Sequence, residues 1–95
     1  MSQTVLEPEL SLDTLGQSRW MVTIFNNDTN SFAEVIAILI EATGCTIEEA
    51  QIEAWEAHTY GKAPVHFGAL KVCDEAAGVI SRIGVRAQVT PEWEN

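Results

Sequence analysis

Few side chains in this sequence could carry out chemistry. They are Asp28, His58, His66, Cys45 and Cys73. A metal site needs ligands at short, regular spacings, whereas the two cysteines lie far apart and the two histidines stand eight residues apart. The sequence therefore predicts no metal site and no cofactor.

A thiol hydrolase could be assembled from Cys73, His58 and Asn26, because a nucleophile and its base need only meet in space. Cys73, however, falls on the apolar stripe of a predicted helix, where a free cysteine behaves as a small hydrophobic residue. The sequence also has no glycine-rich phosphate loop and no nucleophile elbow. We therefore expect no catalytic residue and no enzyme.

The five residues 26–30 form a run of Asn, Asp and Thr side chains, and His58 stands near the end of a predicted helix. Such a run is typical of a turn, since these side chains hydrogen-bond to nearby backbone. A lone histidine near a helix C-terminus is typical of a dipole partner or a core residue. On spacing alone, these residues do not define a site.

Composition limits the partners. Five Lys and Arg against fourteen Asp and Glu give a net charge of −9, which repels phosphate backbones and anionic lipids. We expect no nucleic-acid or membrane partner, although the charge could attract a cationic partner or serve solubility. Two cysteines, no signal-like start and a longest apolar run of only 35–40 favour a cytoplasmic protein, by default a monomer.

The elements that position these residues follow from periodicity. Alternation over 20–25 predicts a strand that ends in the 26–30 loop. Capping-box pairs Ser31 with Glu34 and Thr46 with Glu49 begin two predicted helices, which end before Gly44 and at Gly61.

The second half predicts a short strand over 63–67, with Pro64 indicating an edge or a bulge. A helix from Leu70 closed by Gly84 and a strand over 85–89 follow. The fold class is α+β: a small two-layer β-α-α-β-α-β domain, in which helices cover one face of a three-stranded sheet. We expect a flexible N-terminal arm over 1–18, a core domain over 19–90 and a C-terminal tail over 91–95.

The second helix carries four glutamates, Glu48, Glu49, Glu53 and Glu56, opposite its predicted apolar stripe. A solvated helix face is the favoured interpretation, and an acidic docking patch is the alternative.

Several segments together resemble the ClpS family of adaptors for AAA+ proteases. They are Val22-Thr-Ile-Phe-Asn-Asn-Asp-Thr-Asn-Ser-Phe-Ala-Glu-Val35, Glu49-Ala50, His58-Thr-Tyr-Gly-Lys-Ala63 and Gly84 before the last strand. The resemblance covers about residues 19 to 90, and its combination of an Asn-Asp loop with a His-x-x-Gly-x-Ala segment is fairly specific.

The resemblance implies an adaptor that recognises the N-terminal residue of N-degron substrates and delivers them to a Clp unfoldase and protease. Asn26, Asp28 and His58 fall on the family positions that bind the free α-amino group. This is chemically sensible, because an ammonium offers three donors and needs acceptors.

The resemblance also implies an apolar pocket for a large N-terminal side chain. The matching positions are Asn30, Phe32, Val35, Ala54, Ala57 and Ala87. Core packing is an equally good interpretation of Val35 and Ala57. Two positions depart from the family pattern, since Asn27 stands where a second aspartate is common and Ala54 where a larger residue is common.

Lys71 and Asp74 are the candidate unfoldase-docking residues, although Lys71 replaces a glutamate that is common in the family. The partner is a Clp AAA+ unfoldase of ClpA or ClpC type. The alternatives are a divergent ClpS-like module that docks or modulates a Clp ATPase and recognises another signal, and a generic acidic interaction domain.

Overall fold

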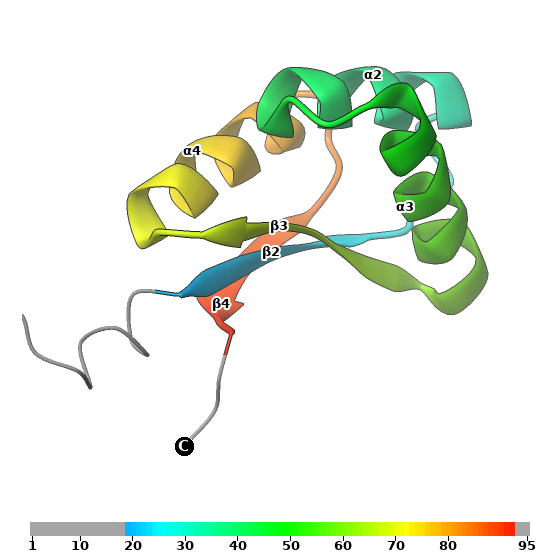
Figure 1. The fold of residues 1–95 in the computed structure, drawn as a ribbon. Helices are drawn as coiled ribbons and strands as arrows, with labels where there is room; N and C mark the ends of the chain where they lie inside the picture. Colours follow the sequence, from blue (N-terminus) through cyan, green and yellow to red (C-terminus); the bar gives the residue numbers. More distant parts are fainter. Residues whose placement is uncertain (1–18, 93–95) are drawn as a thin grey trace, which may run out of the picture.

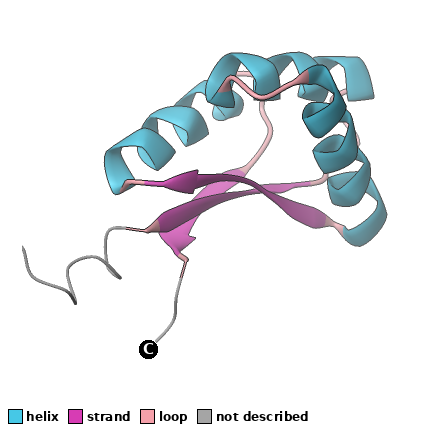
Figure 2. Ribbon diagram, in the orientation of Figure 1, coloured by secondary structure: helices cyan, strands magenta, loops and turns pink. Residues whose placement is uncertain are grey.

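The structure is a computed structural model that describes residues 19–92, and it has two layers (Figures 1 and 2). Its element order is β2 (Trp20–Phe25), α2 (Phe32–Thr43), α3 (Ile47–Tyr60), β3 (Lys62–Gly68), α4 (Leu70–Ser81) and β4 (Ala87–Pro91). The three helices lie on one face of an antiparallel sheet with strand order β3-β2-β4. The predicted fold class and element order are confirmed. The predicted arm over 1–18 and most of the tail lie outside the described residues.

The central strand β2 supplies the middle of the core. Val22 and Ile24 are fully or almost fully buried beneath the helices, as the alternation predicts, and they pack with Leu39 of α2 and Ile80 of α4. These contacts hold the sheet against the helical layer. Because β2 ends at Phe25, the loop that follows it lies between α2 and α3.

Both predicted capping boxes are present. The Ser31 hydroxyl accepts from the Glu34 backbone N–H while the Glu34 carboxylate accepts from the Ser31 backbone N–H, and Thr46 with Glu49 repeats the arrangement. Each helix therefore begins one residue after its cap, as expected.

Pro64 lies where a proline is tolerated. β3 is an edge strand, and the pairing with β2 shifts between Val22 and Thr23, so that Val65 is the extra residue of a bulge. The sequence-based expectation of an edge or a bulge is confirmed on both counts.

The end of α4 and the last strand differ from the prediction. α4 ends at Ser81 with Arg82 as its C-cap, and Gly84, with φ +89°, closes a separate turn by donating its N–H to the Ser81 carbonyl. The strand begins at Ala87 and not Val85, because ladder pairing with β2 starts where Ala87 meets Ile24. Val85 instead lies buried between the turn and the sheet.

Within residues 19–92, no helix combines the length and the apolar character that crossing a bilayer requires.

Candidate functional site

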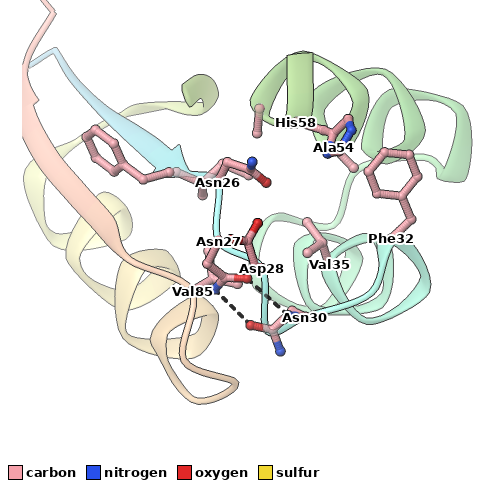
Figure 3. Close-up of a pocket in the computed structure, with 12 residues that line it drawn as sticks. Asn26, Asn27, Asp28, Asn30, Phe32, Val35, Ala54, His58 and Val85 are labelled. Carbon is pink, nitrogen blue, oxygen red and sulfur yellow. Dashed lines mark hydrogen bonds between the residues drawn. The ribbon is translucent and has the colours of Figure 1, made fainter. Parts of the chain in front are cut away.

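One pocket lies between the end of β2, the N-terminus of α2 and the C-terminal half of α3 (Figure 3). Its volume is about 290 Å³. Polar side chains on its wall are Asn26, Asn27, Asp28, Asn30 and His58. Apolar side chains on its wall are Ile24, Phe25, Phe32, Val35, Ala54, Ala57 and Val85. The pocket therefore joins a polar side to an apolar side.

The loop that carries Asn26 and Asp28 is fixed at its start by backbone hydrogen bonds to both sides. The Phe25 N–H donates to the Arg86 carbonyl at 3.0 Å, and the Asn26 N–H donates to the Gly61 carbonyl at 2.9 Å. Gly61 is the left-handed C-cap of α3, with φ +91°, three residues after His58. The chain turn at Gly61 thus holds the Asn26 loop beside the helix end that carries His58.

Asn27 organises the rest of the loop. Its Oδ1 accepts from the backbone N–H groups of Thr29 at 3.1 Å and Asn30 at 3.0 Å. Its Nδ2 donates to Asn30 Oδ1 at 3.0 Å and to the Gly84 carbonyl at 3.4 Å. One amide therefore ties the loop to itself (Figure 3). Through the Gly84 carbonyl it also ties the loop to the turn that precedes Val85.

Asn30 continues this network toward α2. Its Nδ2 donates to Glu34 Oε1 at 3.3 Å, and Glu34 is the carboxylate of the capping box. The pKa of the Glu34 carboxyl lies below its usual value, first because the Ser31 backbone N–H bonds to it and then because the Asn30 side chain does. The loop and the first turn of α2 form one hydrogen-bonded unit.

An aromatic side chain forms part of the pocket wall beside His58. The Phe32 ring is 48% exposed and meets the His58 imidazole edge to face, with 5.2 Å between ring centroids and an angle of 89°. Behind them, Ala54 and Ala57 are buried and present only methyl groups to the pocket. Because these two α3 side chains are small, the pocket next to Phe32 stays open.

A cation lies close to the wall formed by Phe25. The Arg86 guanidinium carbon sits 4.4 Å from the centroid of the Phe25 ring, at cation–π distance.

The structure brings together nearly all residues expected at a ligand site. Asn26, Asp28 and His58 line one pocket with Asn30, Phe32, Val35, Ala54 and Ala57. Ala87 is the exception: it lies partly buried on β4, where it pairs with Ile24 and packs against the core. Val85, which is buried and precedes β4, lines the pocket instead of Ala87.

Sequence reasoning missed Ile24, Phe25 and Val85 as lining residues, and it noted Asn27 only as a departure from the family pattern. An Asn four residues before a helix N-cap is a residue whose side chain commonly hydrogen-bonds to the backbone of the loop. Nothing in the sequence indicated that its donor reaches Gly84, which is 57 residues away.

The structure separates the residues of the thiol hydrolase considered above. Cys73 is fully buried in α4, its Sγ lies 3.8 Å from the Gly68 carbonyl, and it does not line the pocket with Asn26 and His58. Burial, and after it the charge of Asp74, raises the pKa of this thiol, which opposes nucleophilic attack. Over the described segment, no three His, Cys, Asp or Glu side chains gather as metal ligands.

Lys71 and Asp74 lie on the exposed side of α4, and neither lines the pocket. Their neighbours Leu70 and Val72 are 42% and 46% exposed. The two residues expected to dock an unfoldase therefore share an exposed surface that is separate from the pocket.

Comparison with known proteins identifies the family that this chain resembles. A family model described as "ATP-dependent Clp protease adaptor protein ClpS" matches residues 16–89. Among solved structures, the chain is similar to Agrobacterium tumefaciens ClpS2 bound to L-phenylalaninamide, with a TM-score of 0.74 and 17% sequence identity. This likeness covers 80% of the present chain and 99% of the other. A search of curated proteins found no match. The family model spans all three helices and the sheet up to residue 89 of β4, and we conclude that the chain belongs to the ClpS family of adaptor proteins for ATP-dependent Clp proteases.

Proposed function

We propose that this protein recognises the N-terminal residue of N-degron substrates through a free α-amino group and a large hydrophobic side chain. The observation that carries the proposal is the two-sided pocket, in which acceptor groups and an apolar wall lie within one volume of about 290 Å³. A primary ammonium next to an apolar side chain is the chemical pattern that such a pocket complements.

The polar side has the groups that an ammonium needs. Asn26 offers an amide oxygen, Asp28 a carboxylate and His58 an imidazole nitrogen with a free lone pair. The bond to the carboxylate is charge-assisted, so it is roughly twice as strong as a neutral hydrogen bond. Acetylation of the ligand's amino group removes its charge and all but one of its donors, so the site rejects acetylated termini.

The apolar side has room for an aromatic ring. A cavity of about 150 Å³ holds benzene, so the larger pocket here accommodates such a ring together with an amino group. L-phenylalaninamide, the compound bound to ClpS2 of similar fold, has this combination of a free amino group and a benzyl side chain. The closest fit among natural N-terminal residues is therefore Phe, Tyr, Trp or Leu.

The protein then delivers its cargo to a Clp AAA+ unfoldase of ClpA or ClpC type. Membership of the ClpS family supports this step. Docking uses the exposed surface of α4 around Lys71 and Asp74, so a bound substrate and the unfoldase do not compete for the same residues. The N-terminal arm over 1–18 engages the unfoldase.

A second candidate function has support from two positions. Asn27 brings no charge to the amino-group side, and Lys71 places a cation on the docking surface. A ClpS-like module with these changes could dock a Clp ATPase and modulate it, or recognise a different degradation signal.

Binding of labelled peptides that begin with Phe, Leu, Tyr, Trp or Ala, with and without N-terminal acetylation, tests the proposal. We expect the bulky free termini to bind and the Ala-initiated and acetylated peptides to bind at least tenfold more weakly. His58→Ala should weaken binding about tenfold to hundredfold, which is the cost of one hydrogen bond to a charged group. His66→Ala on β3, outside the pocket, is the matched control and should bind normally. Equal affinity for acetylated and free peptides would favour the second candidate.

A further inference from the structure

Helix α3 has its large apolar side chains on the side that faces solvent. Its core contacts are made by the small residues Ala50, Ala54 and Ala57, all buried, whereas Ile52 is 58% and Trp55 51% exposed. A helix that covers a core normally has the opposite arrangement, with large apolar residues inside. The largest apolar side chains of α3 therefore lie outside the core.

These exposed side chains adjoin one another. Ile52 and Trp55 are three residues apart and so lie on one side of the helix. Trp55 packs edge to face against Tyr60, which is 70% exposed, with 5.8 Å between ring centroids and an angle of 90°. We define the α3 outer face as Ile52, Trp55 and Tyr60. Trp and Tyr dominate the energetic centres of protein interfaces.

Acidic residues surround this face. Glu48 and Glu49 precede Ile52 by one helical turn, and Glu56 follows it by one turn. α3 contains no Lys or Arg, and the next basic residue along the chain is Lys62. Within residues 19–92, the ion pairs join Arg19 to Glu92 and Arg82 to Glu41, so these glutamates form none.

We propose that the α3 outer face is a docking surface for a segment of another protein in which apolar side chains are flanked by Lys or Arg. Charge complementarity selects this occupant. A second copy would bring the same four glutamates of α3 against themselves. Residues 1–18 contain Glu7, Glu9 and Asp13 but no Lys or Arg, so the glutamates of α3 would repel them. Anionic lipid would be repelled for the same reason.

The outer face is separate from the pocket, because none of its three residues lines the pocket. α3 packs on α2 and β3, and it forms one end of the helical layer in Figure 1. Both surfaces can therefore be occupied at once, and the docking surface does not depend on the function proposed above.

The test is an NMR titration of the full ¹⁵N-labelled chain with a defined probe. The probe is an 18-residue helix-forming peptide with Leu at helical spacing and Lys on both flanks. Its counterpart has Glu in place of every Lys. We expect the Lys probe to shift α3 amides and the Trp55 indole N–H, and the Glu counterpart to bind at least tenfold more weakly. Added salt should weaken the Lys probe.

Matched variants separate docking from bulk charge attraction. Ile52→Ala with Trp55→Ala should weaken the probe at least tenfold, while Leu70→Ala with Val72→Ala, an exposed apolar pair on α4, should not. Glu48→Lys, at an exposed position, should weaken the Lys probe without truncating the apolar face. Unchanged binding to the Ile52 and Trp55 variant, or equal shifts on α3 and α4, would overturn the proposal.

L-phenylalaninamide serves as the internal control in each variant. Its affinity should be the same in the parent and in every α3 or α4 variant. A variant that loses the Lys probe but still binds L-phenylalaninamide would have a changed outer face and an intact pocket. A parent protein that fails to bind L-phenylalaninamide would contradict the function proposed for the pocket, and it would leave the result for the outer face unaffected.

Discussion

At the scale of single residues, Asn27 shows how much of the site depends on one amide. Its oxygen accepts two backbone N–H groups inside the loop, while its nitrogen donates across to Asn30 and to the Gly84 carbonyl. A carboxylate of the same shape could replace the oxygen but not the donor. Asn27 thus connects the loop to the turn before Val85.

Asn27→Asp should therefore destabilise the protein. Two donated hydrogen bonds are lost and a carboxylate oxygen is left facing two acceptors, so the free energy of unfolding should fall by about 1–2 kcal/mol. Urea denaturation at neutral pH measures this change. Asn30→Ala removes one of the two acceptors and the 3.3 Å bond to Glu34, but it places no carboxylate against an acceptor, so it should cost less. An Asn27→Asp protein as stable as the parent would show that the Nδ2 hydrogen bonds do not hold the loop.

At the scale of secondary-structure elements, α3 exposes apolar side chains and partly buries an acidic one. Glu53 lies three residues after the buried Ala50 and four before the buried Ala57, so it is next to the core side of the helix. Its Oε1 is buried without a hydrogen-bond partner. Burial, and after it the charges of Glu49 and Glu56, raises the pKa of the Glu53 carboxyl to about 7. The expectation that all four glutamates lie on a solvated face is wrong for Glu53.

This raised pKa makes stability depend on pH. Between about pH 4.5 and 7 the folded chain keeps the proton that the unfolded chain has released, so stability falls as pH rises through this window. Because solvent reaches this partly exposed carboxyl, the effect is smaller than the full pKa shift implies. The free energy of unfolding of Glu53→Gln should exceed that of the parent by about 1–2 kcal/mol at pH 8.

Urea denaturation of parent and variant at pH 5 and pH 8 measures the effect. The stability difference between Glu53→Gln and parent should be larger at pH 8 than at pH 5. Glu48→Gln, the same change on the exposed side of the same helix, is the control. An equal difference at both pH values would show that burial of Glu53 imposes no proton-linked cost.

Local signals explain which elements the sequence could predict. β2 alternates and the first two helices begin with capping boxes, so each of these elements is determined by its own residues. The start of β4 is determined by its pairing with β2, which no local pattern contains, and the prediction there was two residues early. Val85, and not Ala87, lines the pocket, which no local pattern indicated either.

At the scale of the whole molecule, every lining residue of the pocket belongs to the two-layer domain described by residues 19–92. Deleting residues 1–18 should therefore leave the affinity for a Phe-initiated peptide within about twofold, since no pocket contact is removed. The same deletion should slow unfoldase-dependent degradation of an N-degron substrate, because the arm is proposed to engage the unfoldase. Peptide anisotropy and a degradation assay measure the two effects. A large loss of affinity would place the arm in the site.

The most direct measurement of the central claim is a double-mutant cycle between the ligand's amino group and Asp28. Isothermal titration of L-phenylalaninamide and its N-acetyl form against parent and Asp28→Asn gives four affinities. If Asp28 binds the ammonium, acetylation should weaken binding to the parent about hundredfold or more, and should weaken binding to Asp28→Asn about tenfold less than that. Equal losses on acetylation in the two proteins, or none in the parent, would contradict recognition of a free N-terminus in this pocket.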